Sequence, residues 1–324
     1  MAVALLHAYK AVSCTDQLCT WSRPRMSAAV NEVCTVADLY PDVPTATVDR
    51  SVLDDDRSAL LNSLQKVNQQ CPLAWFLSSE PPAAGCTVPT LTEIIASLAD
   101  SSKHLQIDEL MCKLPLSKEQ LANIEENTRM QQDNPLWRLY RPGRITASNF
   151  GNVIKCLEAN RKPSPSLLKT LLGEYNAAGA RPVQWGQVHE KTAVERYEAE
   201  TDVQVKPSGL WLHEYGFCGA SPDGIVDDMK IIEVKCPFTV QDKNVLDHVG
   251  DDFFLNIDTD GSLSLNLSNH QGHSYCHQIQ GNLWLTGRSV CDLVVWTTQS
   301  LLILSVQKDE QYSDKYLNLL QKFY

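Results

Sequence analysis

The sequence predicts an α/β domain with a mixed sheet, preceded by a mostly helical and irregular N-terminal extension. Three observations support this prediction. Helix-capping signals stand at Ser117, Thr146 and Ser164, each before a helical segment. Two apolar runs around the polar turn at residues 227–230 are typical of a β-hairpin. A second pair of apolar strands fills residues 289–306, and strands placed between helices favour an α/β arrangement.

Composition indicates a globular intracellular protein. The 324 residues suffice for two domains, or for one domain with a sizeable extension. No apolar run reaches the roughly 20 residues of a membrane span, and the start lacks the basic segment of a signal peptide. The 11 cysteines are odd in number and irregularly spaced, which favours reduced thiols. We therefore expect a protein of the nucleus or cytoplasm that is not secreted and has no membrane partner.

The charge is unevenly distributed along the chain. A net charge of −11 argues against a general nucleic-acid coat. Between Arg138 and Arg181, however, eight Lys and Arg residues stand against only Glu158 and Glu174, which leaves a local net charge of +6. A basic island in an acidic protein suits local binding of a phosphate backbone. From charge alone, a solvated helix face is the alternative interpretation.

The N-terminal region carries no recognisable chemistry. It is predicted to be an accessory region, residues 1–111, that supplies packing or partner contacts. Helical patterns and one linker are expected within it: helices at 3–12, 58–68 and 91–98, and the linker at 37–56. The second domain is placed at 112–324, because every motif described below follows that point.

Helices and strands alternate along the second domain. Helices are expected at residues 117–130, 146–157, 186–200 and 271–285, after Ser164, and at the end of the chain to Tyr324. Strands are expected at 209–213, 216–220, 289–297 and 300–306, and as a hairpin at 253–257 and 262–265. Gly287 is expected to end the helix at 271–285.

The central hairpin, residues 221–237, carries charged residues that suggest chemistry. Successive strand residues point to opposite faces, so Glu233 and Lys235 share one face, while Asp223 lies at the mouth of the other arm. Two carboxylates and one ammonium around a point suit a hard cation that holds a phosphate and an attacking water. A surface ion pair is the alternative, but the flanking Ile and Val residues favour a buried site.

Motifs on both sides of this hairpin occur in a recognisable order. The hairpin reads Ser-Pro-Asp-Gly and then Glu-Val-Lys-Cys-Pro-Phe. The motifs around it are Trp137, Arg141 to Ser148, Trp185 and Gly186 with His189 and Glu190, Tyr275 to Gln280, and Trp284 to Gly287. Together, over residues 115–324, they resemble the YqaJ-type viral recombinase and phage lambda exonuclease branch of the PD-(D/E)XK nucleases.

The resemblance implies a fold, an activity and partners. The fold would be a restriction-endonuclease-like mixed β-sheet flanked by helices. The activity would be Mg²⁺-dependent hydrolysis of DNA phosphodiester bonds, with Mn²⁺ as a substitute. The implied enzyme is an exonuclease that degrades duplex ends in the 5′-to-3′ direction during DNA recombination or end processing. The implied partners are DNA, a strand-annealing protein and further copies of the chain, a trimer being the family precedent.

The resemblance also implies catalytic roles. Asp223, Glu233 and the backbone carbonyl of Val234 would bind the metal, and Glu190 would join them from its helix. Lys235 would orient the attacking water or stabilise the developing negative charge.

The remaining implied roles concern the nucleophile and the substrate. Gln278 would position the nucleophile or hydrogen-bond near the lysine. Arg141, Arg144 and Ser148 would form a pocket for a 5′-terminal phosphate, because arginine offers a planar fork and the nearby helix start adds N–H donors.

Two other function classes stay open. One is a non-catalytic DNA-end-binding module that kept the fold, and the other is an endonuclease on structured DNA that needs no 5′-phosphate pocket. Two of the histidines, His273 and His277, are four residues apart on a predicted helix, with His270 and Cys276 nearby. They suggest a transition-metal site as a weaker alternative, because no third ligand is evident.

The first residues allow a zinc interpretation. His7, Cys14, Cys19 and Cys34 could belong to a zinc site, although their spacing is not a closed ligand pattern. The segment also resembles the sequence that follows a SWIM-type zinc finger in some eukaryotic YqaJ-type proteins. The ligands of that finger would precede Met1, so this second resemblance implies a partial gene product.

Overall fold

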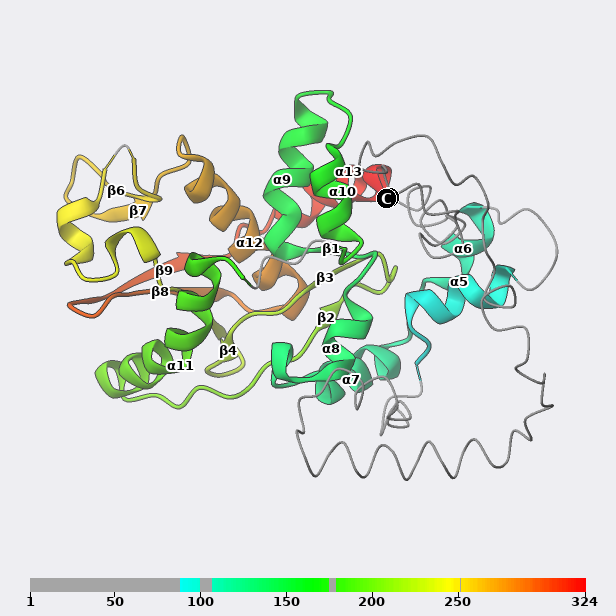
Figure 1. Ribbon diagram of the computed structural model, residues 1–324, viewed down its shortest axis with the longest axis horizontal. Coiled ribbons are helices and arrows are strands. Elements are labelled where there is room, and N and C mark those ends of the chain that lie inside the picture. The colour runs from blue at the N-terminus through cyan, green and yellow to red at the C-terminus, as the bar shows by residue number, and fades with distance from the viewer. Residues whose placement is uncertain (1–87, 100–106, 175–178, 251) are drawn as a thin grey trace, which may run out of the picture. The chain divides into compact units, whose positions relative to one another are not determined.

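The structure is a computed structural model that describes residues 88–99, 107–174, 179–250 and 252–324 (Figure 1). The zinc interpretation and the helices and linker predicted before residue 69 lie outside the described residues. Within the described ranges, no helix is both long enough and apolar enough to cross a membrane.

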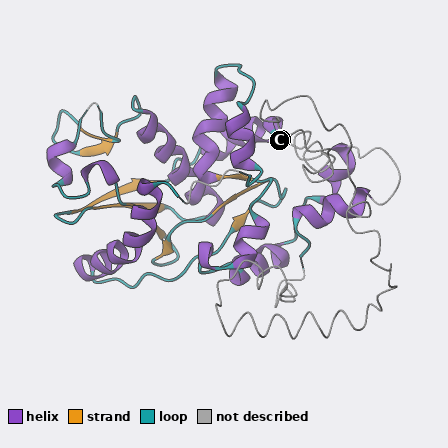
Figure 2. Cartoon of the chain, in the orientation of Figure 1, coloured by secondary structure: helices purple, strands orange, loops and turns teal. Residues whose placement is uncertain are grey.

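Helices make up much of the described chain (Figure 2). The α-helices are α5 (Leu91–Ala99), α6 (Ile107–Lys113), α7 (Lys118–Asn127), α8 (Pro135–Tyr140), α9 (Ala147–Glu158), α10 (Pro165–Leu171), α11 (Arg181–Thr201), α12 (His270–Thr286) and α13 (Tyr312–Phe323). Short 3₁₀ turns are η1 (Gln131–Asp133), η2 (Phe238–Val240) and η3 (Val245–His248). The strands are β1 (Ile145–Thr146), β2 (Trp211–Leu212), β3 (Cys218–Ala220), β4 (Gly224–Ile225), β5 (Lys230–Lys235), β6 (Leu255–Ile257), β7 (Leu263–Leu265), β8 (Val290–Trp296) and β9 (Leu301–Gln307).

The capping signals at Ser117 and Ser164 are confirmed. Ser117 Oγ accepts a hydrogen bond from the Gln120 N–H at 3.2 Å, and the Gln120 side chain accepts one from the Ser117 N–H at 2.8 Å. Ser164 Oγ accepts a hydrogen bond from the Leu167 N–H at 3.1 Å, and Pro165 stands in the first turn of α10. Gly287, with φ of 70°, ends α12.

Some boundaries differ from the prediction. Helix α11 begins at Arg181 rather than near residue 186, because a proline is tolerated in the first turn of a helix. Helix α8 was not predicted; Asn134 caps it and Pro135 opens it. Helix α6 was not predicted either. Strands β2 and β3 are shorter than expected.

The main sheet has the strand order β4-β5-β8-β9. Strands β5 and β8 are parallel, and the two outer pairs are antiparallel, so the sheet is mixed as predicted. Ile231 packs in one hydrophobic cluster with Ile279 of α12, whereas Ile232 packs in another with Ala193 and Tyr197 of α11. The alternation along β5 therefore presents its two faces to two helices.

A small sheet, β1-β3-β2, brings two distant segments together. Its strands β1 and β3 are parallel, with Ile145 opposite Cys218 and Thr146 opposite Gly219. Parallel strands end at the same edge of a sheet. Strand β1 leads directly into α9 and β3 into Asp223, so the start of α9 and this carboxylate lie at one edge.

Helices α9 and α12 cross at close range. A Cβ added to Gly281 would lie 2.7 Å from the ring of Phe150 and 3.0 Å from the Cβ of Ala147. Glycine is therefore required at this contact. The crossing holds the first turn of α9 against the middle of α12, which carries Gln278.

Helices α5 and α6 contribute to the same core. Leu91, Ile95 and Leu110 are buried in one hydrophobic cluster with Phe150 of α9 and Tyr316 of α13. These residues precede the boundary predicted at residue 112. That boundary stays a prediction, and this packing gives a reason to test it.

Candidate active site

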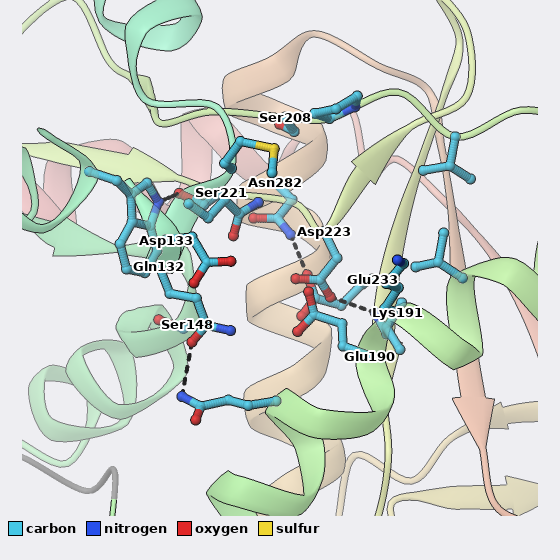
Figure 3. A pocket seen from close by; sticks show the side chains of 18 of the residues that line it. Gln132, Asp133, Ser148, Glu190, Lys191, Ser208, Ser221, Asp223, Glu233 and Asn282 are labelled. Atoms are coloured by element: carbon cyan, nitrogen blue, oxygen red, sulfur yellow. Dashed lines mark hydrogen bonds between the residues drawn. The ribbon is translucent and has the colours of Figure 1, made fainter. Parts of the chain in front are cut away.

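A cleft of about 670 Å³ opens between the two sheets and their helices. It is lined by residues of η1, α8, α9, α11, β5 and α12 and of the segment that leads into β4. Figure 3 shows the carboxylates of Glu190, Asp223 and Glu233 gathered in this cleft. Of the residues predicted to act at the site, Glu190, Asp223, Glu233, Val234, Lys235, Gln278, Arg141 and Ser148 line the cleft, whereas Arg144 does not.

Asp223 is fixed to the strand opposite it. Its N–H donates to the Ile232 carbonyl at 3.2 Å, which is the last backbone contact before β4 and β5 separate. Beyond that point, Asp223 Oδ2 accepts a hydrogen bond from the Val234 N–H at 2.7 Å. The carboxylate thus takes the position that a backbone carbonyl would have in a longer strand.

Glu233 is buried and held by three donors. Its Oε1 accepts hydrogen bonds from Lys235 Nζ at 2.6 Å and from Gln278 Nε2 at 2.5 Å. Its Oε2 accepts one from Asn282 Nδ2 at 2.8 Å. Glu233 is only 1% exposed, so these three bonds compensate for the water that the carboxylate has lost.

Lys235 lies between the sheet and α12. Its Nζ contacts Glu233 and also donates to Gln278 Oε1 at 3.3 Å. The ammonium is 4.7 Å from the centre of the Tyr275 ring, within cation–π range. Tyr275 and Gln278 are three residues apart on α12, so they share one helix face, and that face holds Lys235.

Glu190 comes to the cleft from α11. The helix is anchored by a ring stack in which Trp185 lies 3.7 Å from His189, and His189 lies 5.2 Å from Trp296 of β8. Ala193 and Tyr197 pack below them against the sheet. This anchoring places Glu190, next in sequence to His189, on the side of the helix that lines the cleft.

Carboxylates outnumber cations at this point of the cleft. Burial raises the pKa of Asp223 well above its ordinary range, and the charges of Glu233 and Glu190 raise it further. Burial and then the charge of Glu233 also raise the pKa of Glu190. Burial lowers the pKa of Lys235, but Glu233 and neighbouring groups outweigh that effect and raise it overall. Asp223 and Glu190 therefore bind protons more readily than free carboxylates do, because their ionised forms are desolvated and repel the charge of Glu233.

The cluster suits a hard divalent cation, which prefers carboxylate and carbonyl oxygens. The N–H and C=O of a strand residue point to the same side, so the Val234 carbonyl faces the side of Asp223. Among the described residues, no three His, Cys, Asp or Glu side chains are already arranged as a metal cluster. Glu233 has three of about four acceptor positions filled, so a cation would take the fourth or displace an amide.

Arg141 lies at the other end of the cleft. Its guanidinium stacks on the Trp137 ring at 3.8 Å, and the Trp137 Nε1 donates to Ser221 Oγ at 2.9 Å. Ser221 is two residues before Asp223, so the stack is tied to the carboxylate segment. Burial lowers the pKa of Arg141 to about 10, which leaves it charged at neutral pH.

The first turn of α9 faces the same space as Arg141. Thr146, Ala147 and Ser148 line the cleft, and Ser148 is exposed there. Thr146 is the N-cap residue, as predicted, but it makes no capping hydrogen bond; its Oγ1 lies 3.1 Å from Ser148 Oγ. The N–H groups of this turn are directed at the cleft end of the helix, where an anion is favoured.

Arg144 has a different position from the one predicted. It is 2% exposed, its Nε donates to the Gly216 carbonyl at 2.8 Å, and its Nη1 donates to the Tyr140 carbonyl at 2.5 Å. It ties α8 to the loop before β3. This position gives no support to the phosphate-binding role predicted for Arg144, because its guanidinium already donates hydrogen bonds to backbone carbonyls away from the cleft.

Asn282 was not predicted. It is 1% exposed and donates to Glu233 from one turn beyond Gln278 on α12. The four-residue spacing places both amides on one helix face, and that spacing was the available signal.

The transition-metal alternative gains no support. His277 is buried, its Nδ1 lies 2.9 Å from the Tyr312 hydroxyl, and burial, followed by His273 and Lys315, lowers its pKa to about 4. The described residues contain no cluster of three metal-ligating side chains that includes it. His277 is therefore a core residue that joins α12 to α13. Burial raises the pKa of the Cys236 thiol to about 12, which disfavours its reactive thiolate form.

Comparison with known proteins gives consistent similarities. Residues 136–289 match the YqaJ-like viral recombinase domain. The chain is 24% identical over 223 residues to the alkaline nuclease of Autographa californica nuclear polyhedrosis virus, which covers 63% of this chain and 51% of the relative. The chain thus spans about half the length of the curated relatives it matches.

Solved structures are similar as well. The alkaline exonuclease of Laribacter hongkongensis has 24% sequence identity and a TM-score of 0.41, over 56% of this chain and 87% of that one. The shutoff and exonuclease protein of Kaposi's sarcoma-associated herpesvirus has 10% identity and a TM-score of 0.46, over 86% and 85%. The residues 136–289 that match the YqaJ-like viral recombinase domain include the central hairpin, Arg141 and Gln278, so the similarity covers the candidate site.

Proposed function

We propose that this chain is a metal-dependent deoxyribonuclease that degrades duplex DNA from its ends, in the 5′-to-3′ direction. The observation that carries the proposal is the gathering of Glu190, Asp223 and Glu233 beside Lys235 in one cleft that also contains Arg141. A carboxylate cluster supplies cation ligands, and the arginine supplies an anchor for phosphate.

The proposed cation is Mg²⁺, with Mn²⁺ as a substitute. Asp223, Glu233 and the Val234 carbonyl would hold it, with Glu190 as a further ligand. When bound, such a cation neutralises charge on a phosphodiester and lowers the pKa of water. A bound cation would relieve the repulsion between these carboxylates, which supports this assignment.

The remaining residues of the cleft have separate tasks in this proposal. Lys235, charged and held by Glu233, would stabilise negative charge that develops on the scissile phosphate. Gln278 contacts both of these residues and would orient the attacking water. Asn282 would keep the Glu233 carboxylate in one orientation.

The direction of degradation follows from the proposed pocket at Arg141 and Ser148. A terminal phosphate carries more charge than an internal diester, so an arginine fork beside a helix start favours it. Degradation of 5′ ends would leave 3′ single strands, which suits a role in recombination or end processing with a strand-annealing protein. Assembly of several copies around the duplex is part of the same proposal and rests on the family resemblance alone.

The test uses purified full-length chain with Mg²⁺ on linear and on closed circular duplex DNA. We expect degradation of linear DNA only, loss of 5′-end label first, and no activity in the presence of a chelator. Nicked circles would instead indicate an endonuclease, and intact DNA with end binding would indicate a non-catalytic module.

Variants connect the activity to the cluster. Asp223→Asn and Glu233→Gln should abolish cleavage while DNA binding is largely retained. Glu195→Gln is a matched control, because Glu195 lines the same cleft on α11 but pairs with Lys191 at 3.8 Å rather than with the cluster. Full activity in Asp223→Asn with Mg²⁺ would remove this carboxylate as a ligand.

A further inference from the structure

A second cavity of about 400 Å³ lies between α9, the loop that follows it and α10. Three of its lining residues are cationic, namely Lys155, Arg161 and Lys162. No Asp or Glu is among the described residues that line it. In a chain with a net charge of −11, such a concave basic surface attracts anions locally.

The backbone that carries these cations is well fixed. After α9 ends, the Asn160 N–H donates to the Leu157 carbonyl at 2.9 Å, and the Arg161 N–H donates to the Cys156 carbonyl at 2.9 Å. Asn160 has φ of 49°, the left-handed conformation that such a helix end requires. Ser164 then caps α10. The loop therefore holds the basic side chains on a rigid frame.

The positive charges are also not neutralised by protein groups. Across the described ranges, Lys155, Arg161 and Lys162 form no ion pair. Glu158 lies three residues after Lys155 on α9, where a pair would be feasible, but the two form none. All three cations are exposed. They are free to contact an anionic ligand.

The basic cavity adjoins the candidate active site. Thr146 to Ser148, in the first turn of α9, line the catalytic cleft, and the next residue, Asn149, lines the basic cavity. Consecutive residues of α9 therefore line the two cavities, so one DNA molecule could contact both.

We infer that the cavity lined by Lys155, Arg161 and Lys162 binds the phosphate backbone of the DNA substrate away from the cleaved bond. This inference rests on the proposed function and extends it, because it adds a second contact that holds the duplex. The repeating anions of a backbone match several unpaired cations better than one small anion does.

The test compares the triple variant K155Q/R161Q/K162Q with wild type and with Lys169→Gln. Lys169 is a matched control, since it is exposed on α10 but lines neither cavity. Affinity is measured with Ca²⁺ in place of Mg²⁺ for blunt duplexes of increasing length over a range of salt. Cleavage rates are then measured with Mg²⁺ on the same duplexes.

We expect the affinity of the triple variant for long duplexes to be at least about tenfold lower than that of wild type. If three phosphate contacts are lost, the slope of log K against log salt should be less steep by about 2.7. Duplexes too short to reach the cavity should be bound and cleaved as by wild type. The Lys169 variant should match wild type throughout.

Four results would overturn the inference. An unchanged salt slope with normal cleavage would show that the cavity does not hold the backbone, while the proposed function stands. Equal weakening for all lengths would show a general loss of charge or structure rather than a distant contact. Competition by inorganic phosphate alone, without the length effect, would assign the cavity to a small anion. A wild-type protein inactive on every duplex would reject the proposed function and this inference with it.

Discussion

Replacing Arg141 by alanine removes the proposed anchor of the 5′-phosphate without touching the carboxylate cluster. The guanidinium stacks on Trp137 at 3.8 Å, and Trp137 is in turn held by Ser221, so the ring should stay in place in the variant. Burial lowers the pKa of Arg141 to about 10, which indicates that the cation is already partly desolvated before substrate arrives.

The size of the effect follows from the bonds that are lost. A hydrogen bond to a charged group is worth about 1.5–3 kcal/mol. That range corresponds to roughly a 10- to 150-fold loss in kcat/KM on 5′-phosphate duplexes. On 5′-hydroxyl duplexes the loss should be small, because the extra charge that Arg141 would bind is absent. The variant should therefore show no preference between the two ends.

The assay measures initial degradation rates on matched 5′-phosphate and 5′-hydroxyl duplexes with Mg²⁺. Arg141→Lys keeps the charge but loses the planar fork, so it should fall between wild type and Arg141→Ala. Arg196→Ala is the control, because Arg196 is an exposed arginine that pairs with Glu200 and does not line the cleft.

Equal wild-type rates on the two ends would refute the phosphate-pocket assignment and favour the endonuclease alternative. A preference that survives in Arg141→Ala would place the phosphate elsewhere in the cleft. An equal loss in the Arg196 variant would indicate a general charge effect.

Two further predictions concern stability. Because the folded-state pKa of Asp223 is raised, its protonated form favours the fold at acidic pH, and that contribution is lost as the pH rises from the ordinary Asp value through the folded value. Without added cations, the Asp223→Asn variant should therefore melt at a temperature roughly 2–4 °C higher than wild type at alkaline pH, which is the shift that about 1 kcal/mol of stability gives in a domain of this size. At acidic pH the variant should melt at the same temperature as wild type. A lower melting temperature of the variant at alkaline pH would contradict this prediction. Truncation to residues 112–324 removes Leu91, Ile95 and Leu110 from the core and should lose the melting transition of the full chain; an unchanged transition in the truncated chain would support the boundary predicted from sequence.

The parts of the fold that were predictable depend on short-range rules. The reciprocal hydrogen bonds of Ser117 and Gln120 are set by residues three apart, and the structure contains both. The shared face of Glu233 and Lys235 follows from strand alternation, and the two side chains are 2.6 Å apart. These features need no knowledge of distant segments.

The parts that were not predictable depend on long-range packing. Arg141 and Arg144 are the same residue type three positions apart, yet one stacks in the cleft and the other is buried on the carbonyls of Tyr140 and Gly216. The neighbouring sequence does not distinguish the two arginines, because their different positions arise from the pairing of β3 with β1. Asn282 escaped notice for a similar reason: its partner, Glu233, lies 49 residues away.

The carboxylate cluster shows how the fold and the proposed activity oppose each other. Neutral side chains at residues 190 and 223 would stabilise the fold more than ionised carboxylates do, since both carboxyl groups have raised pKa values. The Glu233 carboxylate accepts hydrogen bonds from Lys235, Gln278 and Asn282, but within the described chain the Asp223 carboxylate accepts one only from the Val234 N–H. A cation bound here would offset the charge that the protein leaves uncompensated. Because protons and cations would compete for the same oxygens, cation affinity and cleavage should both increase as the pH rises from the acidic side.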